Sequence, residues 1–258
     1  MRGDGEAPKA PVIMVHGAFC GGWAFDAFRA PFEAAGHPVL TPDLKGRGGG
    51  SRGMASMADF AAGVADIVRA QSQAPILIGH SLGGLVAQLA ATRASVRGLI
   101  LLAPSAPWGV AGGSMEEAVS AVSLYGLGPY WLQAIEPDYS IARTYSLDRL
   151  DKAARKAVFA RMVPESGRAL WETLNWWLDP FMTTSVRAGR IAAPVLGVAG
   201  GRDLVHPSPT VRRTVERLGG EMKVFDEMSH WLLSEPGWEL VADACLAWIA
   251  RQAPISAA

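Results

Sequence analysis

This sequence has few cysteines, no net charge and no long apolar run. It has only two cysteines, Cys20 and Cys245, far apart along the chain and outside any Cys-x-x-Cys or Cys/His cluster. This pattern argues against a disulfide framework and against a structural zinc site. Lys plus Arg and Asp plus Glu both number 24, which gives a formal net charge of +0. Without a basic excess we expect no nucleic-acid partner, and a small neutral substrate fits better than a polyanion.

No segment approaches the roughly 20 consecutive apolar residues of a membrane-spanning helix. Residues 1–11 are polar and lack the apolar run of a secretory signal. We therefore expect a cytoplasmic protein with reduced thiols and no membrane partner. Hydrophobic residues make up 50% of the 258 positions, which supports a large core and argues against disorder.

Short apolar runs alternate with stretches of helical periodicity along most of the chain. The runs predict strands at residues 11–15, 38–41, 75–78, 98–102, 194–198 and 222–225, and the periodicity predicts helices at residues 59–70, 82–91, 209–218 and 239–251. Continuous apolar strands are typical of parallel sheets that are covered on both faces. The alternation therefore predicts an α/β fold with a doubly wound, mostly parallel sheet.

One segment breaks the alternation. Residues 109–189 separate two predicted strands by about 80 positions, far more than an ordinary connection. Helices are predicted there at residues 116–124, 151–162 and 167–178, and no strand is predicted. We interpret residues 109–189 as a helical cap segment inserted over a core formed by residues 1–108 and 190–258.

The cap segment is rich in aromatic side chains. Most of them are expected to pack the segment onto the core, and together they indicate a largely apolar pocket roof. From this reasoning the residues predicted to contact a substrate are Phe19, Trp131, Trp176, Trp177 and Trp231.

The sequence Gly-His-Ser-Leu-Gly at residues 79–83 matches the G-x-S-x-G pattern around a nucleophilic serine. Residues 49–53 match the same pattern around Ser51, so context must separate the two. Ser81 directly follows a predicted strand and directly precedes an amphipathic helix, whereas Ser51 follows a Gly/Arg tract. A sharp strand-to-helix turn exposes the hydroxyl and needs small residues two positions to either side. We therefore predict Ser81 as the nucleophile; its alternative role is that of a helix N-cap.

Residues 48–53 also match the dinucleotide fingerprint G-x-G-x-x-G. They lack the strand and helix that this motif requires, so we interpret them as a loop rather than a nucleotide site. No cofactor and no metal is expected.

A nucleophilic serine needs N–H donors for the developing oxyanion. The N–H of Leu82, the residue after the nucleophile, is one predicted donor. The second is predicted in the glycine-rich loop that follows the first strand, at Ala18, with Phe19 as the alternative.

The serine also needs a base and a carboxylate that orients the base. His230 follows the last predicted strand and a short loop, and Asp203 follows the strand at residues 194–198. Both positions lie at the carboxyl edge of the sheet, where open α/β sheets bind ligands. Asp226 is a poorer choice because it precedes His230 by only four residues. We predict the set Ser81, Asp203 and His230, in the order expected for this architecture.

Taken together, HGAFCGGW, GHSLGG, GGRD and SHWLLSEP resemble the α/β-hydrolase superfamily, in particular its compact branch of carboxylesterases, methylesterases and hydroxynitrile lyases. The resemblance covers nearly the whole chain. It implies the same roles for Ser81, Asp203, His230, Ala18 and Leu82.

The resulting prediction is a serine hydrolase that cleaves a carboxylic ester of a small apolar or aromatic molecule. A second copy of the chain, in a homodimer, is a candidate partner. Lactonase, thioesterase, amidase and C–C bond hydrolase activities share this set of residues and stay open. A hydroxynitrile lyase would need a cation near the base, and Lys223 lies on a strand. The alternative of another class is a ligand-binding receptor without turnover.

Overall fold

The computed structural model describes residues 9–50, 53–112, 114, 119 and 122–252. Its centre is a sheet of six strands in the order β2-β1-β3-β4-β7-β8. The strands are β1 (Val12–Val15), β2 (Val39–Leu40), β3 (Ile76–His80), β4 (Gly98–Leu102), β7 (Val195–Gly200) and β8 (Glu221–Phe225). Every pairing between them is parallel. The predicted doubly wound, mostly parallel sheet is therefore confirmed.

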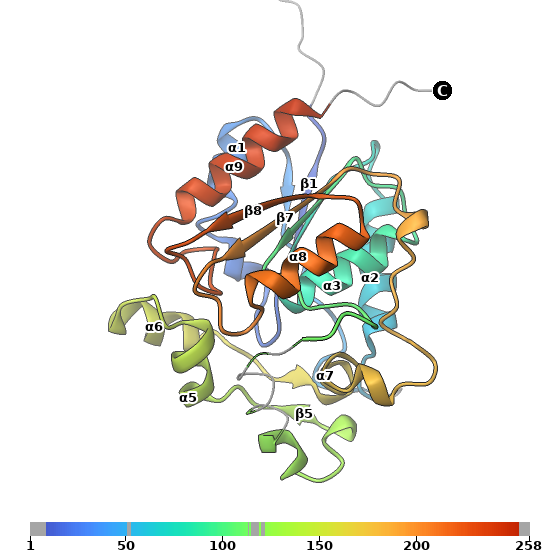
Figure 1. The fold of residues 1–258 in the computed structure, drawn as a ribbon, viewed down its shortest axis with the longest axis vertical. Coiled ribbons are helices and arrows are strands. Elements are labelled where there is room, and N and C mark those ends of the chain that lie inside the picture. Colours follow the sequence, from blue (N-terminus) through green and yellow to red (C-terminus); the bar gives the residue numbers. More distant parts are fainter. Residues whose placement is uncertain (1–8, 51–52, 113, 115–118, 120–121, 253–258) are drawn as a thin grey trace, which may run out of the picture.

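The four inner strands, β1, β3, β4 and β7, are buried on both faces because helices cover both faces. On one side lie α1 (Ala30–Ala34) and α9 (Trp238–Arg251), and on the other α2 (Met57–Arg69), α3 (Leu82–Ala91) and α8 (Ser208–Arg217) (Figure 1). Along β1, Val12 and Met14 pack in the same core cluster as Trp248 of α9, whereas Ile13 and Val15 pack in the cluster that holds α2 and α3. The two-residue period of a strand thus divides the apolar side chains between two cores.

The cap segment lies beyond the carboxyl ends of the strands (Figure 1). Its described elements are η2 (Tyr130–Leu132), β5 (Ala134–Ile135), α5 (Tyr139–Ile141), η3 (Ala142–Ser146), α6 (Lys152–Phe159), β6 (Glu165–Ser166), α7 (Gly167–Leu174), η4 (Trp176–Leu178) and η5 (Ala188–Arg190). The remaining short helix, η1 (Gly22–Phe25), belongs to the core. The helix predicted at residues 116–124 falls largely outside the described residues.

The prediction that the cap segment contains no strand is wrong. β5 and β6 pair antiparallel as a separate two-stranded sheet, with Ala134 opposite Ser166 and Ile135 opposite Glu165. Each strand has two residues, too few to produce an alternating pattern in the sequence. Among the helices of the described residues, none has the length and apolar character that crossing a membrane requires.

Helix α3 approaches the end of β1 so closely that only glycine fits at the contact. A Cβ atom added to Gly83 would lie 2.3 Å from the carbonyl oxygens of both Val15 and His16. These neighbours are backbone atoms of a buried strand end, so they cannot move aside without displacing the sheet. The close contact sets where the first turn of α3, and the residue before it, stand relative to β1.

We predict that Gly83→Ala lowers the free energy of unfolding by about 3 kcal/mol or more, because the added methyl overlaps backbone atoms. Gly63→Ala is the matched control, since Gly63 lies in α2 with nothing within 4 Å of an added Cβ. Alanine is the better helix former, so this variant should gain about 0.5–1 kcal/mol. Urea unfolding followed by circular dichroism measures the free energy of unfolding of both variants. Equal stabilities for the two variants would contradict the proposed clash.

Candidate active site

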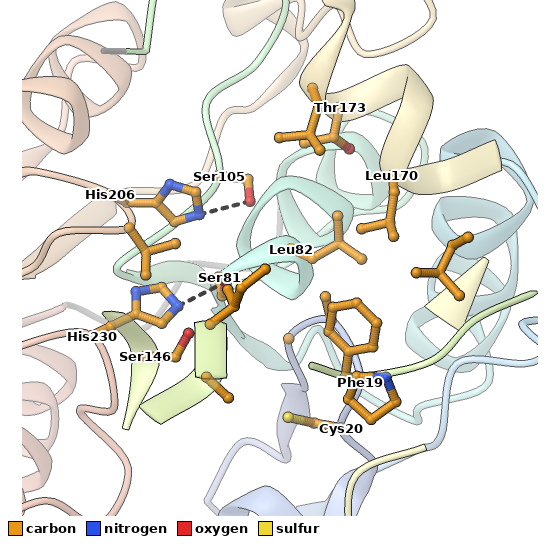
Figure 2. Close-up of a pocket in the computed structure, with 18 of the residues that line it drawn as sticks. Phe19, Cys20, Ser81, Leu82, Ser105, Ser146, Leu170, Thr173, His206 and His230 are labelled. Carbon is orange, nitrogen blue, oxygen red and sulfur yellow. Dashed lines mark hydrogen bonds between the residues drawn. The ribbon is translucent and has the colours of Figure 1, made fainter. Parts of the chain in front are cut away.

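The three residues predicted as nucleophile, base and acid come together at the carboxyl edge of the sheet. The Nε2 atom of His230 lies 3.0 Å from Oγ of Ser81. Its Nδ1 atom lies 3.0 Å from Oδ2 of Asp203. All three side chains are buried, and Figure 2 shows His230 facing Ser81. The geometry permits proton transfer between the hydroxyl and the imidazole, with the carboxylate fixing the orientation of the ring.

Asp203 is held as a carboxylate by the contacts around it. Burial alone would raise the pKa of its carboxyl, but the neighbouring His230 and the hydrogen bonds that it accepts lower that pKa below its ordinary value. While Oδ2 faces His230, Oδ1 accepts the backbone N–H groups of Val205 and His206 at 2.8 and 2.9 Å. The acid therefore stays ionised at neutral pH and cannot turn away from the histidine without losing these bonds.

Ser81 occupies the strained turn between β3 and α3. Its backbone has φ +53° and ψ −124°, outside the regions that L-residues ordinarily populate. A Cβ on Gly79 would lie 2.4 Å from the carbonyl oxygen of Gly83, which explains the glycine at position 79, while the contact with β1 explains Gly83. The Ser81 hydroxyl makes no capping hydrogen bond to α3, so the N-cap alternative is not supported.

The two N–H groups predicted for the oxyanion, those of Ala18 and Leu82, belong to residues that line a cavity beside Ser81. Within the described residues neither group donates to another protein atom. The alternative donor, the N–H of Phe19, is already used: it donates to Oε2 of Glu165 at 3.1 Å. This arrangement favours Ala18 over Phe19 as the second donor.

The cap segment forms hydrogen bonds with both the backbone N–H and the backbone carbonyl of Phe19. Besides the bond to Glu165, the Phe19 carbonyl accepts the N–H of Val163 at 2.9 Å. Phe19 has φ +62°, a conformation that a bulky residue holds only when its surroundings impose it. Arg47 strengthens the attachment, since Nη1 lies 3.8 Å from Oε2 of Glu165 and also donates to the carbonyl of Cys20. The loop at residues 17–20 therefore depends on the cap segment for its shape.

Two histidines that the sequence analysis gave no role hold the backbone of the site. His80 Nε2 donates to the carbonyl oxygen of His230 at 2.9 Å. Nδ1 of His16 donates to the Gly17 carbonyl at 2.8 Å, and its Nε2 accepts the Leu44 N–H at 3.0 Å. Burial lowers the pKa to about 3 for His80 and to about 4 for His16, so both rings are neutral. Both histidines lie in quoted motifs, His16 in HGAFCGGW and His80 in GHSLGG, but the sequence does not show which backbone groups their rings contact.

A cavity of about 360 Å³ opens in front of Ser81, between the core and the cap segment. Three of the five residues predicted to contact a substrate line it, namely Phe19, Trp176 and Trp231. The other two, Trp131 and Trp177, lie outside the lining, with 40% and 59% of their surfaces exposed. Apolar side chains from the cap segment form much of the wall: Leu124, Leu127, Ile135, Ile141, Met162, Leu170 and Leu174.

Ser51, the serine of the competing G-x-S-x-G match, lies outside the described residues. Among the residues that the structure does describe, no group of three or more His, Cys, Asp or Glu side chains is arranged to hold a metal ion.

Comparison with known proteins agrees with this architecture. A family model described as "Alpha/beta hydrolase family" matches residues 12–244. The structure of a methylesterase from Arabidopsis superposes with a TM-score of 0.71 over 93% of this chain and 99% of that chain, at 18% identity. At this identity the likeness shows a shared fold.

Two relatives are similar in sequence. A pyrethroid hydrolase of Sphingobium wenxiniae is 44% identical over 77 residues, which are 28% of this chain and 27% of that protein. An sn-1-specific diacylglycerol lipase of Mus musculus is 25% identical over 251 residues, 90% of this chain and 78% of that protein.

Glu165 makes the stability of the protein depend on pH. Burial raises the pKa of its carboxyl from 4.5 to about 7, so the folded state binds this proton more tightly than the unfolded state. The contribution is fully present below pH 4.5 and is lost as pH rises to about 7. We predict that the free energy of unfolding of the wild type, relative to Glu165→Gln, falls by about 2–3 kcal/mol across this range.

Urea unfolding at a series of pH values measures the difference. Glu33→Gln is the control, because Glu33 is exposed and pairs with Arg29 on the surface of α1. A difference between wild type and Glu165→Gln that is flat from pH 4.5 to 7 would exclude a buried titrating carboxyl.

Proposed function

The chain belongs to the alpha/beta hydrolase family, and from this premise we propose that it is a serine hydrolase that cleaves carboxylic esters through an acyl-enzyme. One observation carries the proposal: the His230 ring lies 3.0 Å both from Oγ of Ser81 and from Oδ2 of Asp203. A buried hydroxyl, imidazole and carboxylate in series is the arrangement that activates a serine for attack on a carbonyl.

In the first half of the proposed reaction His230 Nε2 accepts the Ser81 hydroxyl proton as Oγ attacks the ester carbonyl. The carbonyl oxygen becomes an oxyanion, which the N–H groups of Leu82 and Ala18 stabilise. When this tetrahedral intermediate collapses, the bond between carbonyl carbon and alcohol oxygen breaks. The imidazolium of His230 gives its proton to the departing alcohol, and the acyl group stays on Ser81.

In the second half, water replaces the alcohol. His230 accepts a proton from the water as its oxygen attacks the acyl carbon, and then returns the proton to Ser81 Oγ as the acid leaves. Asp203 holds the ring so that Nδ1 carries a proton and Nε2 faces the serine, and it stabilises the imidazolium that forms twice in each cycle. All groups used are side chains and N–H groups of this chain.

The cavity supports a small substrate with apolar groups. Its volume of about 360 Å³ falls at the lower end of the range for small-molecule sites, and aliphatic side chains of the cap segment form much of its wall. The names of the similar proteins point in the same direction, since they include a pyrethroid hydrolase, a lipase and a methylesterase. Esters with short or aromatic acyl and alcohol groups are the substrates we propose.

We predict that Ser81→Ala lowers kcat for a short p-nitrophenyl ester by a factor on the order of 10⁵, because no other group takes the acyl chain. Ser146→Ala is the matched control, since Ser146 lines the same cavity. A fluorophosphonate probe should label the wild type and Ser146→Ala but not Ser81→Ala. Near wild-type turnover by Ser81→Ala would reject the assignment, and an unlabelled wild type that binds a ligand tightly would favour a receptor.

Asp203→Asn should lower kcat by about 10⁴-fold, because an amide donor at this position favours the tautomer in which Nδ1 is bare and Nε2 carries the proton. Asp148→Asn is the control: Oδ1 of Asp148 accepts a hydrogen bond at 2.8 Å from Oγ of Ser229, the residue before His230. We expect the control to retain kcat within about tenfold, because an amide oxygen at this position can still accept a hydrogen bond from the Ser229 hydroxyl. Steady-state kinetics on the same ester measure kcat for both variants. Equal losses of kcat would contradict the role of Asp203.

A further inference from the structure

The cavity contains a second serine–histidine pair that the proposed reaction does not use. Oγ of Ser105 lies 3.0 Å from Nε2 of His206, and both residues are buried and line the cavity. Figure 2 shows this pair beside the Ser81–His230 pair, with its own hydrogen bond. The centroids of the two histidine rings are 5.3 Å apart. Because Ser81, Ser105 and His206 line the same cavity, a ligand bound beside Ser81 lies close to the Ser105–His206 pair.

Both members of the pair are held in place by the predicted catalytic residues. Ser105 follows β4, and its backbone N–H donates to the carbonyl oxygen of Ser81 at 2.9 Å. His206 lies in the loop after β7, and its backbone N–H donates to Oδ1 of Asp203 at 2.9 Å. The pair therefore stands at a fixed position relative to the reacting atoms, as specific recognition of a substrate group requires.

The pair differs in two respects from a nucleophile and its base. Asp203 contacts the ring of His230 but reaches His206 through the backbone N–H. The Ser105 turn also lacks the glycines of a nucleophile elbow, since Ala103 and Pro107 stand two positions to either side. These features indicate recognition rather than a second acyl transfer.

The protonation state of His206 determines what Ser105 offers to a ligand. Burial, and then the proximity of His230, lower the pKa of His206 to about 4, so the ring is neutral at neutral pH. Whichever ring nitrogen carries the proton, Ser105 Oγ and His206 Nε2 share one hydrogen bond. Ser105 Oγ therefore keeps at least one lone pair as an acceptor for a ligand.

We propose that the Ser105–His206 pair binds a hydroxyl group of the substrate, with Ser105 Oγ accepting a hydrogen bond from that hydroxyl, so that the preferred substrates are hydroxyl-bearing esters. This inference rests on the proposed ester hydrolysis and narrows its substrate class. In a largely apolar cavity, a hydroxyl that reaches Ser105 recovers a hydrogen bond lost on leaving water, whereas a hydroxyl placed against the aliphatic wall does not. A methyl group at the same place leaves the acceptor unused.

The test compares esters of equal size that differ by one hydroxyl. On the alcohol side these are 2-hydroxyethyl butanoate and propyl butanoate, and on the acyl side ethyl 3-hydroxypropanoate and ethyl butanoate. Moving a hydroxyl out of water disfavours it in every variant, so the measure is how the hydroxyl-to-methyl ratio of kcat/KM changes on mutation. We expect Ser105→Ala to lower this ratio about tenfold in one arm, and that arm identifies which half of the ester lies at Ser105.

Thr173→Val is the matched control, because Thr173 also lines the cavity but its hydroxyl donates to the Ala169 carbonyl within α7. It should leave both ratios unchanged. Labelling of Ser81 by a fluorophosphonate reports whether each variant keeps an intact site. Should Ser105→Ala fail this check, Ser105→Cys replaces it, since a thiol is a similar shape but a poor acceptor.

Ratios that stay within twofold of wild type in both arms for a correctly labelled Ser105 variant would overturn the recognition role. That result differs from failure of the proposed function, in which the wild type hydrolyses none of the four esters and Ser81 is not labelled.

Discussion

The contact between the first turn of α3 and the end of β1 is the constraint on which the rest of the site depends. Gly83 allows the helix to meet the carbonyl oxygens of Val15 and His16, and Gly79 allows the preceding strand to turn sharply. Ser81 is thereby raised above the sheet edge with its backbone outside the ordinary regions. The other groups of the site act on this hydroxyl, so a displacement of the turn would change the distance from Ser81 Oγ to each of them.

Much of the core was predictable from sequence because its signals are local and strong. Six apolar runs correspond to six strands, and the helix predicted at residues 82–91 begins and ends where α3 does. Ser81, Asp203 and His230 were identifiable because each follows a strand, and parallel strands end at one edge. The structure brings these three side chains together, while their roles in catalysis stay predictions.

The parts that escaped prediction depend on contacts between distant segments. β5 and β6 have two residues each, too few for a period. Trp131 and Trp177 resembled pocket residues by composition, but the direction of a side chain on a short turn is set by packing that no local pattern records. His206 bonds Ser105, which lies 101 positions away along the chain, and Glu165 bonds Phe19, which lies 146 positions away. No local pattern reveals either contact.

The attachment of Phe19 by Val163 and Glu165 bears on how enzymes of this fold are re-engineered. A cap segment is the natural element to exchange when new specificity is sought, since it forms much of the pocket wall. In this chain residues 163–165 also brace the loop that carries Ala18. A graft that replaces the cavity wall but omits these contacts would alter turnover as well as specificity, so residues 17–20 and 163–165 need to be transferred together.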